Sequence, residues 1–448
     1  MPCELSLNMP ETSLPTSCTA AATPWTCPLC SLLCEGPAPQ VAALGPAPWP
    51  AASPCPRADA GLRALQAGWA APVPALLDKQ AVPAGTALQA AAQRLAHWQQ
   101  PLFAGLGTDI AGSRALYRLA ARVGAITDHM DGEALMQGVR AVQDRGQYLC
   151  TLGELRSRAT LVVCVGTSAI DHYPAFFRRA GLGAPDSPCR DLVFFGTPVP
   201  EGLPAGVACG LNTRHLPGSG DLAADLQQLA ALVDGQHLRR SSPAQAALAT
   251  LADELLAAPY AVLVWEAARL PAEGALLVEM LNRVVASLNR RTRAAAFGLG
   301  GNDGGFSVNQ TLTWLSGLPL RTRVSRDGLQ HEPRAYGCER LMAQDAVDGL
   351  LWISSFSPQR LPPATPLPRI VLGPPAMAAE LTRAAALDNC IFIPVATPGV
   401  TTAGHLFRTD GPIVLPLFAL PDLPPAQATL PSVAQVLSEL DTLMGAMQ

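Results

Sequence analysis

Four cysteines near the N-terminus are the residues of this chain whose type and spacing best predict chemistry. Cys27, Cys30 and Cys34 form a CxxCxxxC pattern, and Cys55 follows in the next stretch of chain. Three sulfurs in one tight loop and a fourth from a following segment can form a tetrahedral thiolate cage, which suits an iron–sulfur cluster or zinc. The alternative is that they are ordinary reduced cysteines in a proline-rich leader. We predict a metal centre at these four residues.

Composition and charge exclude several classes of protein. The chain has 448 residues, of which 49% are hydrophobic and 15% charged, so it can bury large cores. The net charge of −4 leaves no basic stripe, which argues against nucleic acid as a partner. The start of the sequence lacks the pattern of a signal peptide, and no long uncharged apolar run predicts a membrane helix. Together with twelve cysteines that fit a reducing compartment, these features predict a cytoplasmic protein without membrane attachment.

Short apolar runs alternate with Ala- and Leu-rich helical patterns along the chain. Runs that end in Gly or Pro and alternate with amphipathic helices are typical of a parallel sheet covered by helices, so the sequence predicts an α/β fold. Strands are expected at 101–106, 160–165, 191–195, 261–265, 294–299, 349–353, 369–372 and 390–395. Helices are expected at 87–98, 113–123, 221–232 and 244–256.

The loops that follow the predicted strands are the places where a parallel sheet binds ligands. Residues 105–109 could hold an anion with backbone N–H groups, or could be a tight turn into a helix. In the loop after the next strand, Gly166, Thr167, Ser168 and His172 could contact a nucleotide phosphate, although a single histidine in such a loop is more often structural. The glycine-rich segment 300–305 is too irregular for a dinucleotide fingerprint and is expected to be a flexible rim loop.

Motifs of independent hydrolytic enzymes are missing from the sequence. It contains no GxSxG, HExxH or GxxxxGK[ST] pattern and no GxGxxG after a predicted strand, which argues against a free-standing nucleotide-dependent enzyme. Asp128, His129 and Asp131 are close in sequence but follow no spacing rule, so we expect them to be solvated loop residues.

Several long stretches together resemble the B subunit of formylmethanofuran dehydrogenase, a member of the molybdopterin/tungstopterin oxidoreductase superfamily. The resemblance is carried by CPLCSLLC with Cys55, by QQPLFAGLGTDIAGSRALYRLAARVGA at 99–125, by CTLGELRSRATLVVCVGTSAIDHYP at 150–174, by NQTLTWLSGLPLRTRVSRD at 309–327 and by IFIPVATPGVTTAGHLFRTDG at 391–411. The last stretch is the most specific, and the match runs along most of the chain.

The resemblance implies two Rossmann-like parallel-sheet domains, one inserted in the other, behind a small cysteine-rich segment. It divides the chain into a tail at 1–22, a [4Fe–4S]-type segment at 23–62, an α/β domain at 63–150 plus 251–410, an inserted α/β domain at 151–250 and a C-terminal arm at 411–448. In active members these domains hold a tungsten- or molybdenum-bearing pterin guanine dinucleotide that interconverts carbon dioxide and formate. Electrons pass through a [4Fe–4S] cluster, for which Cys27, Cys30, Cys34 and Cys55 would be the ligands here.

The sequence departs from that family where the chemistry would occur. Active members carry a cysteine or selenocysteine metal ligand in the segment that corresponds to 124–138, and alignment places Ala134 near that position. Alanine offers no soft donor, so direct metal ligation is lost. The end of the strand at 191–198, Phe-Gly-Thr-Pro, lacks the carboxylate that the family places near the nucleotide. The pterin cofactor is therefore expected to be lost, with 166–172 as a remnant of its binding loop.

These departures favour a B-type component of the related bacterial formyltransferase/hydrolase complex. The resemblance implies a non-redox structural subunit with A-, C- and D-type partners in one-carbon metabolism, where formyl groups pass from tetrahydromethanopterin through a methanofuran-type cofactor to formate. No catalytic residue is assigned to the chain itself. The alternative is a catalytic tungsten- or molybdenum-dependent dehydrogenase subunit.

Overall fold

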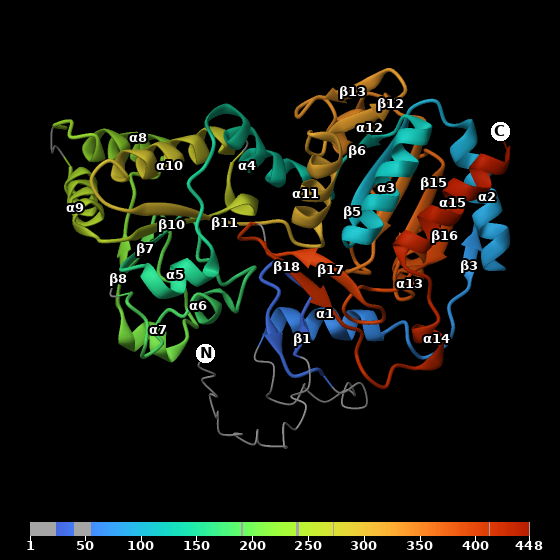
Figure 1. The fold of residues 1–448 in the computed structure, drawn as a ribbon, viewed down its shortest axis with the longest axis horizontal. Coiled ribbons are helices and arrows are strands. Elements are labelled where there is room, and N and C mark those ends of the chain that lie inside the picture. The colour runs from blue at the N-terminus through green and yellow to red at the C-terminus, as the bar shows by residue number, and fades with distance from the viewer. Residues whose placement is uncertain are drawn as a thin grey trace, which may run out of the picture.

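The protein consists of two α/β domains joined by an N-terminal and a C-terminal segment, as a computed structural model of the chain shows (Figure 1). The structure describes residues 24–39, 55–189, 191–238, 242–271, 273–411 and 413–447. The predicted tail at 1–22 lies outside the described residues, as does the middle of the predicted cysteine-rich segment. The α/β class expected from the sequence is confirmed.

A five-stranded, wholly parallel sheet forms the smaller domain. Its order is β11-β10-β7-β8-β9, with bounds Ala294–Leu299, Ala261–Glu266, Leu161–Val165, Asp191–Phe195 and Asn212–Leu216. The chain moves outward from β7 in one direction through β8 and β9, and in the other through β10 and β11. The sheet therefore has a switch point between β7 and β10, where the order reverses.

Helices cover both faces of this sheet because its strands are apolar on both sides. One face packs on α4 (Gly132–Arg145), α8 (Leu222–Val233), α9 (Pro243–Ala257) and α10 (Gly274–Leu288). The other face packs on α5 (Leu152–Arg158), α6 (Phe176–Arg179) and α7 (Ala205–Gly210), with a cluster of phenylalanines at its centre.

The larger domain contains a nine-stranded mixed sheet. Its order is β13-β12-β6-β5-β14-β15-β16-β3-β4, with bounds Gly328–His331, Thr322–Ser325, Ile126–Thr127, Pro101–Gly107, Gly349–Ser354, Arg369–Gly373, Cys390–Pro394, Ala75–Leu77 and Gln80–Val82. One face packs on α2 (Ala84–His97), α3 (Ile110–Val123), α11 (Gly305–Ser316) and α15 (Val433–Met447). The other packs on α12 (Cys338–Ala343) and α13 (Met377–Arg383).

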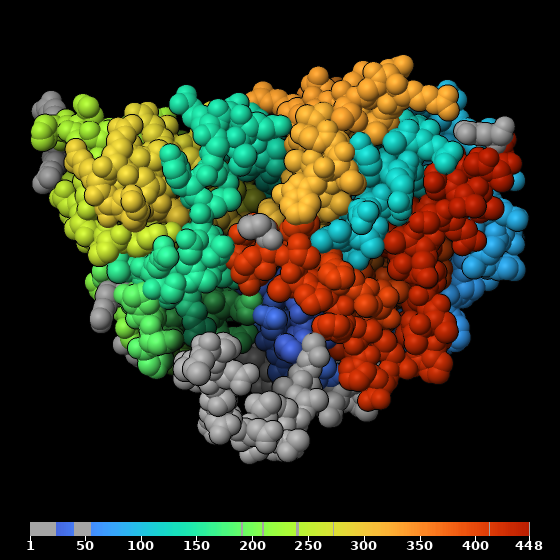
Figure 2. Space-filling view, viewed as in Figure 1, coloured from blue at the N-terminus to red at the C-terminus, as the bar shows by residue number. Residues whose placement is uncertain are grey.

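Two hairpins and α1 lie where the two domains meet. A hairpin of β1 (Trp25–Thr26) and β2 (Glu35–Gly36) contains Cys27, Cys30 and Cys34, and α1 (Pro56–Gln66) follows Cys55. A second hairpin is made of β17 (Gly404–Phe407) and β18 (Val414–Leu417). The short η2 (Ala267–Arg269) and α14 (Pro425–Ala428) complete the chain. In Figure 2 the N-terminal residues, in blue, are flanked by the smaller domain and by the red C-terminal segment.

All eight predicted strands are present, and the four predicted helices match α2, α3, α8 and α9 to within a few residues. Along the chain the strands of the smaller domain, β7 to β11, lie between β6 and β12 of the larger one. The inserted stretch ends later than the sequence predicts. The expected boundary at residue 250 cuts through the five-stranded sheet, because β10 and β11 pair with β7. Residues 433–447, expected within a C-terminal arm, instead form α15 and pack into the core of the larger domain. No helix among the described residues is long and apolar enough to span a membrane.

The burial of α15 predicts that the C-terminal helix stabilises the larger domain. Leu437 is fully buried against α2 and α3, so Leu437→Ala should lower the free energy of unfolding by about 2–5 kcal/mol in chemical denaturation. The neighbouring exposed Ser438→Ala is the matched control and should change it by less than about 0.5 kcal/mol. Equal stability of the two variants would contradict the packing of this helix.

Candidate functional site

A buried carboxylate occupies the switch point of the smaller sheet. Glu266 ends β10 and is only 1% exposed. The Thr167 hydroxyl donates a hydrogen bond of 2.6 Å to its Oε2, and His172 Nδ1 is paired with its Oε1. Charged groups are buried at a high cost unless they are partnered, so these two contacts hold the loop after β7 in place.

The predicted ligand loop is thus used largely for structure. Gly166 takes a φ of +63° and donates its N–H to Phe195 O at 2.8 Å, while Thr167 is bound to Glu266. The Ser168 hydroxyl is buried without a hydrogen-bond partner in the described chain. Of the four predicted residues only His172 lines a large cavity. Sequence reasoning missed Glu266, which is a polar residue at the end of an otherwise apolar strand.

That cavity, of about 650 Å³, lies between the two domains. Its walls come from α4, the ends of β10 and β11, the glycine-rich segment 298–302 and α11. Ala134 on α4 lines it, and the correspondence of Ala134 to the metal-ligand position of the family stays a prediction. The Ala134 side chain is a methyl group, which has no donor atom for tungsten or molybdenum.

The glycine-rich segment is closely packed, which differs from the expected flexible rim. A Cβ on Gly304 would lie 2.4 Å from Thr108 O, and one on Gly305 would lie 2.8 Å from the His129 ring. Both positions therefore require glycine because the 105–109 turn and His129 approach them. In that turn Asp109 Oδ1 accepts a 2.9 Å hydrogen bond from Gly112 N and caps α3, so 105–109 is a tight turn whose helix N-terminus is already satisfied.

The expectation that Asp128 and His129 are solvated is wrong, since each is 2% exposed. Asp128 accepts hydrogen bonds from Arg321 Nε at 3.2 Å and from Cys338 N at 2.8 Å. Burial raises the pKa of Asp128, and the Arg321 guanidinium partly offsets the rise. Asp128, directly after β6, thus contacts the residue that precedes β12 and the start of α12.

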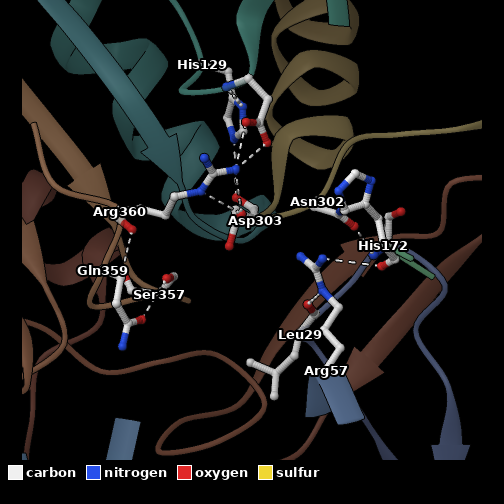
Figure 3. A network of polar contacts seen from close by, with 12 residues as sticks. Leu29, Arg57, His129, His172, Asn302, Asp303, Ser357, Gln359 and Arg360 are labelled. Atoms are coloured by element: carbon white, nitrogen blue, oxygen red, sulfur yellow. Dashed lines mark hydrogen bonds and ion pairs between the residues drawn. The ribbon is translucent and has the colours of Figure 1, made fainter. Parts of the chain in front are cut away.

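Arg360, in the wall of the cavity, forms a second ion-pair group with Asp303 (Figure 3) and with Asp131. Arg360 Nη2 lies 2.7 and 2.9 Å from the two oxygens of Asp131 and 3.4 Å from Asp303 Oδ2. Two carboxylates therefore share one guanidinium, whose charge they neutralise.

The cysteine loop is held at the domain junction by hydrogen bonds to distant segments. Trp25 Nε1 donates to Gly399 O at 2.7 Å, and Arg57 Nε donates to Leu29 O at 2.8 Å. Ser31 N donates to Asn302 Oδ1 at 3.0 Å, and Asn302 Nδ2 in turn donates to the Tyr173 hydroxyl at 3.1 Å. The loop is closed by Cys27 N donating to Cys34 O at 2.9 Å, with Leu33 at a φ of +44°.

The four cysteines come into one region, but the structure divides their side chains between two apolar clusters. Cys27 and Cys55 pack with Leu62 and Trp69, whereas Cys30 and Cys34 pack on the phenylalanine core of the smaller domain. Among the residues that the structure describes, no three His, Cys, Asp or Glu side chains are grouped so that they could hold a metal ion. A metal centre at these cysteines is not preassembled in this arrangement and stays a prediction.

Electrostatics favour the thiol over the thiolate at Cys27 and Cys30 in this arrangement. Burial raises the pKa of Cys30 to about 12, and the neighbouring Cys34 adds to the rise. Burial also raises the pKa of Cys27, with Cys30 as the next contribution. Metal binding would have to displace protons from both groups.

The described residues do not fit a pterin-bound metal either. Ala134 offers no ligand, and Glu266, the carboxylate at the switch point of the smaller sheet, is already bound by Thr167 and His172. Strand β8 ends at Phe195, and the residues that follow, Gly196, Thr197 and Pro198, bring no carboxylate.

No model of a known protein family matches the chain. A solved structure of the formyltransferase/hydrolase complex FhcABCD from Methylorubrum extorquens, in complex with methylofuran, contains a chain that matches with a TM-score of 0.68 and 25% identity. The match covers 83% of this chain and 99% of that one. The B subunit of the same complex from Methylorubrum extorquens is 29% identical over 333 residues, which cover 72% of this chain and 84% of the relative.

The chain is similar to the B subunit of the formyltransferase/hydrolase complex. A more distant relative is the B subunit of the tungsten-containing formylmethanofuran dehydrogenase 2 of Methanocaldococcus jannaschii, 24% identical over 381 residues, with 77% of this chain and 80% of the relative covered. The resemblance expected from the sequence is therefore confirmed for both groups of relatives.

The contacts of Asn302 predict that it fastens the cysteine loop to the smaller domain. Asn302→Ala removes the acceptor for Ser31 N and the donor to Tyr173, and should lower the free energy of unfolding by about 1–3 kcal/mol. Limited proteolysis should then cut the 24–39 segment faster. Tyr173→Phe removes the hydroxyl that accepts from Asn302 Nδ2 but leaves the hydrogen bond between Ser31 N and Asn302 Oδ1 in place, so it should have a smaller effect. Unchanged protease resistance in Asn302→Ala would contradict the anchoring role.

Proposed function

We propose that this chain is the non-redox, structural B subunit of a formyltransferase/hydrolase complex. Such a complex converts formyl-tetrahydromethanopterin, through a methanofuran-type cofactor, to formate in the one-carbon metabolism of methylotrophs. The observation that carries the proposal is Ala134, which contributes a methyl group to the wall of the interdomain cavity, near the position where the family resemblance implies a metal ligand in active members. Formyl transfer and hydrolysis involve no net electron transfer, so a B-type component without a redox metal is sufficient for them.

In this proposal the two α/β domains are the two Rossmann-like domains of the molybdopterin-oxidoreductase type, and each contains one of the two large sheets. The strand order β11-β10-β7-β8-β9 supports it for the smaller domain, because an order that reverses at a switch point is typical of doubly wound folds. The chain would act as a scaffold for A-, C- and D-type partner subunits, on which formyl transfer and hydrolysis would take place. A shared fold does not carry the catalytic activity with it, because activity depends on the residues of the site.

A second candidate is the catalytic subunit of a tungsten- or molybdenum-dependent dehydrogenase. Two observations favour it: the similarity to the tungsten-containing dehydrogenase subunit and the presence of four N-terminal cysteines. It requires metal ligation by some residue other than Ala134, or by the cofactor alone.

Elemental analysis of the native complex distinguishes the two candidates. The chain would be tagged in its own host and purified without oxygen, and we expect A-, C- and D-type subunits to copurify, with tungsten and molybdenum far below one atom per chain. Stoichiometric tungsten or molybdenum would refute the scaffold proposal. Purification of the chain without these partners would also argue against it.

The same preparation tests whether the cysteines bind a metal. If they do, Cys30→Ser should lose the iron or zinc and become more sensitive to protease, because a metal would order the N-terminal segment. Cys164→Ser is the matched control, since Cys164 in β7 is also buried but is not one of the four cysteines of the predicted metal site. Identical metal content, melting and protease sensitivity of the wild type and both variants would show that the four thiols bind no metal.

A further inference from the structure

One arginine at the interdomain cavity has no counter-charge. Arg57, near the start of α1, lines the cavity and uses two of its five N–H donors, from Nε to Leu29 O at 2.8 Å and from Nη1 to His172 O at 3.3 Å. Both acceptors are neutral carbonyl groups. No carboxylate of the described chain forms an ion pair with Arg57, and Figure 3 shows its guanidinium between Leu29 and His172. Three donors and a full positive charge remain available.

The other charged groups of the cavity wall are already matched. Arg360 is bound by both oxygens of Asp131 and approached by Asp303. Glu266 is bound by Thr167 and His172. Arg57 is therefore the cation at this cavity, within the described part of the chain, that a bound anion could neutralise without displacing an existing ion pair.

Trp265 adds aromatic surface to the same wall. It is 6% exposed and lines the cavity, while its indole N–H is buried and has no hydrogen-bond partner within the described structure. Because that nitrogen has almost no accessible surface, Trp265 meets the cavity through the carbon atoms of its ring. Trp265 directly precedes Glu266, whose partner His172 presents its carbonyl to Arg57.

The rest of the wall is mainly apolar. Leu135 and Val139 of α4 and Phe306 of α11 contribute aliphatic and aromatic surface, and Ala134 leaves room beside them. A planar guanidinium matches the two oxygens of a carboxylate, whereas an apolar wall favours an organic body. A phosphate dianion would bring two charges to a single free cation, with the carboxylates of Asp131 and Glu266 also in the wall.

We propose that the interdomain cavity binds a small organic monocarboxylate, with its carboxylate on Arg57 and its apolar body along α4 and α11 toward Trp265. The site takes an anion near the position where the family resemblance implies a metal ligand, and it involves no covalent or redox step. The inference stands on Arg57, Trp265 and the cavity, and does not depend on the proposed function.

The test is ligand binding to the full chain in its native complex. Formate, acetate, butyrate and benzoate would be titrated by ligand-observed NMR and by calorimetry, with inorganic phosphate and chloride as competitors. We expect saturable binding with Kd at or below about 10 mM, tighter for butyrate or benzoate than for formate because of the apolar wall. Butyrate should also change the fluorescence of Trp265, and Trp265→Phe should abolish that change while binding persists in NMR.

Arg57→Gln should weaken carboxylate binding about tenfold or more, because it removes the charge and the paired donors. Arg57→Lys keeps the charge and should weaken it less, which separates ligand binding from any loosening of the contact with Leu29. Arg63→Gln is the matched control, since Arg63 lies on the same helix, pairs with Asp59 and does not line the cavity. It should leave binding unchanged.

Absence of saturable binding below about 50 mM would overturn the proposal. So would equal loss of affinity in Arg57→Gln and Arg63→Gln, which would place the site elsewhere. Phosphate or chloride binding with the same affinity as butyrate would show an unselective anion site and refute the assignment to an organic carboxylate.

Discussion

The burial of Glu266 is the constraint from which the contacts at the domain junction follow. A carboxylate at the carboxyl end of β10 must be partnered, and Thr167 and His172 supply the partners from the loop after β7. Holding that loop places His172 O beside Arg57 and the Tyr173 hydroxyl beside Asn302. Arg57 and Asn302 then bind the cysteine loop at Leu29 and Ser31. One buried charge thereby links the smaller domain to the N-terminal segment.

The same group of contacts forms the polar part of the wall of the interdomain cavity. Glu266 and its partners lie at the switch point, where a doubly wound sheet normally receives its ligand. Ala134 contributes only a methyl group to the α4 wall of the cavity. The two sheets and their helices remain fully packed, since their stability depends on apolar layers and not on the cavity between them.

Much of the fold could be predicted from the sequence because the central strands are continuous apolar runs. β7, β8, β10 and β11 of the smaller sheet have this pattern, and so do β5 and β14–β16 of the larger one. The short strands β3, β4, β6, β12 and β13 were not predicted, because they are defined by pairing with neighbouring strands more than by composition. The predicted domain boundary at residue 250 differs from the structure for a related reason. β10 belongs to the smaller sheet because it pairs with β7, and β7 lies far from it in the chain.

The sequence by itself determined which side chains are present: four cysteines in a ligand-like spacing, and a methyl group at Ala134, near the position where the family resemblance implies a metal ligand. It also determined the α/β class, because alternation of apolar runs and amphipathic helices is a local property of the chain. Only the tertiary structure decided how those side chains are used. The thiols are divided between two apolar clusters, Asp128 is buried beside Arg321, and Arg57 is left without a carboxylate. The physical reason is that burial and ion pairing depend on residues brought together from distant parts of the chain, and local sequence carries no record of those distances.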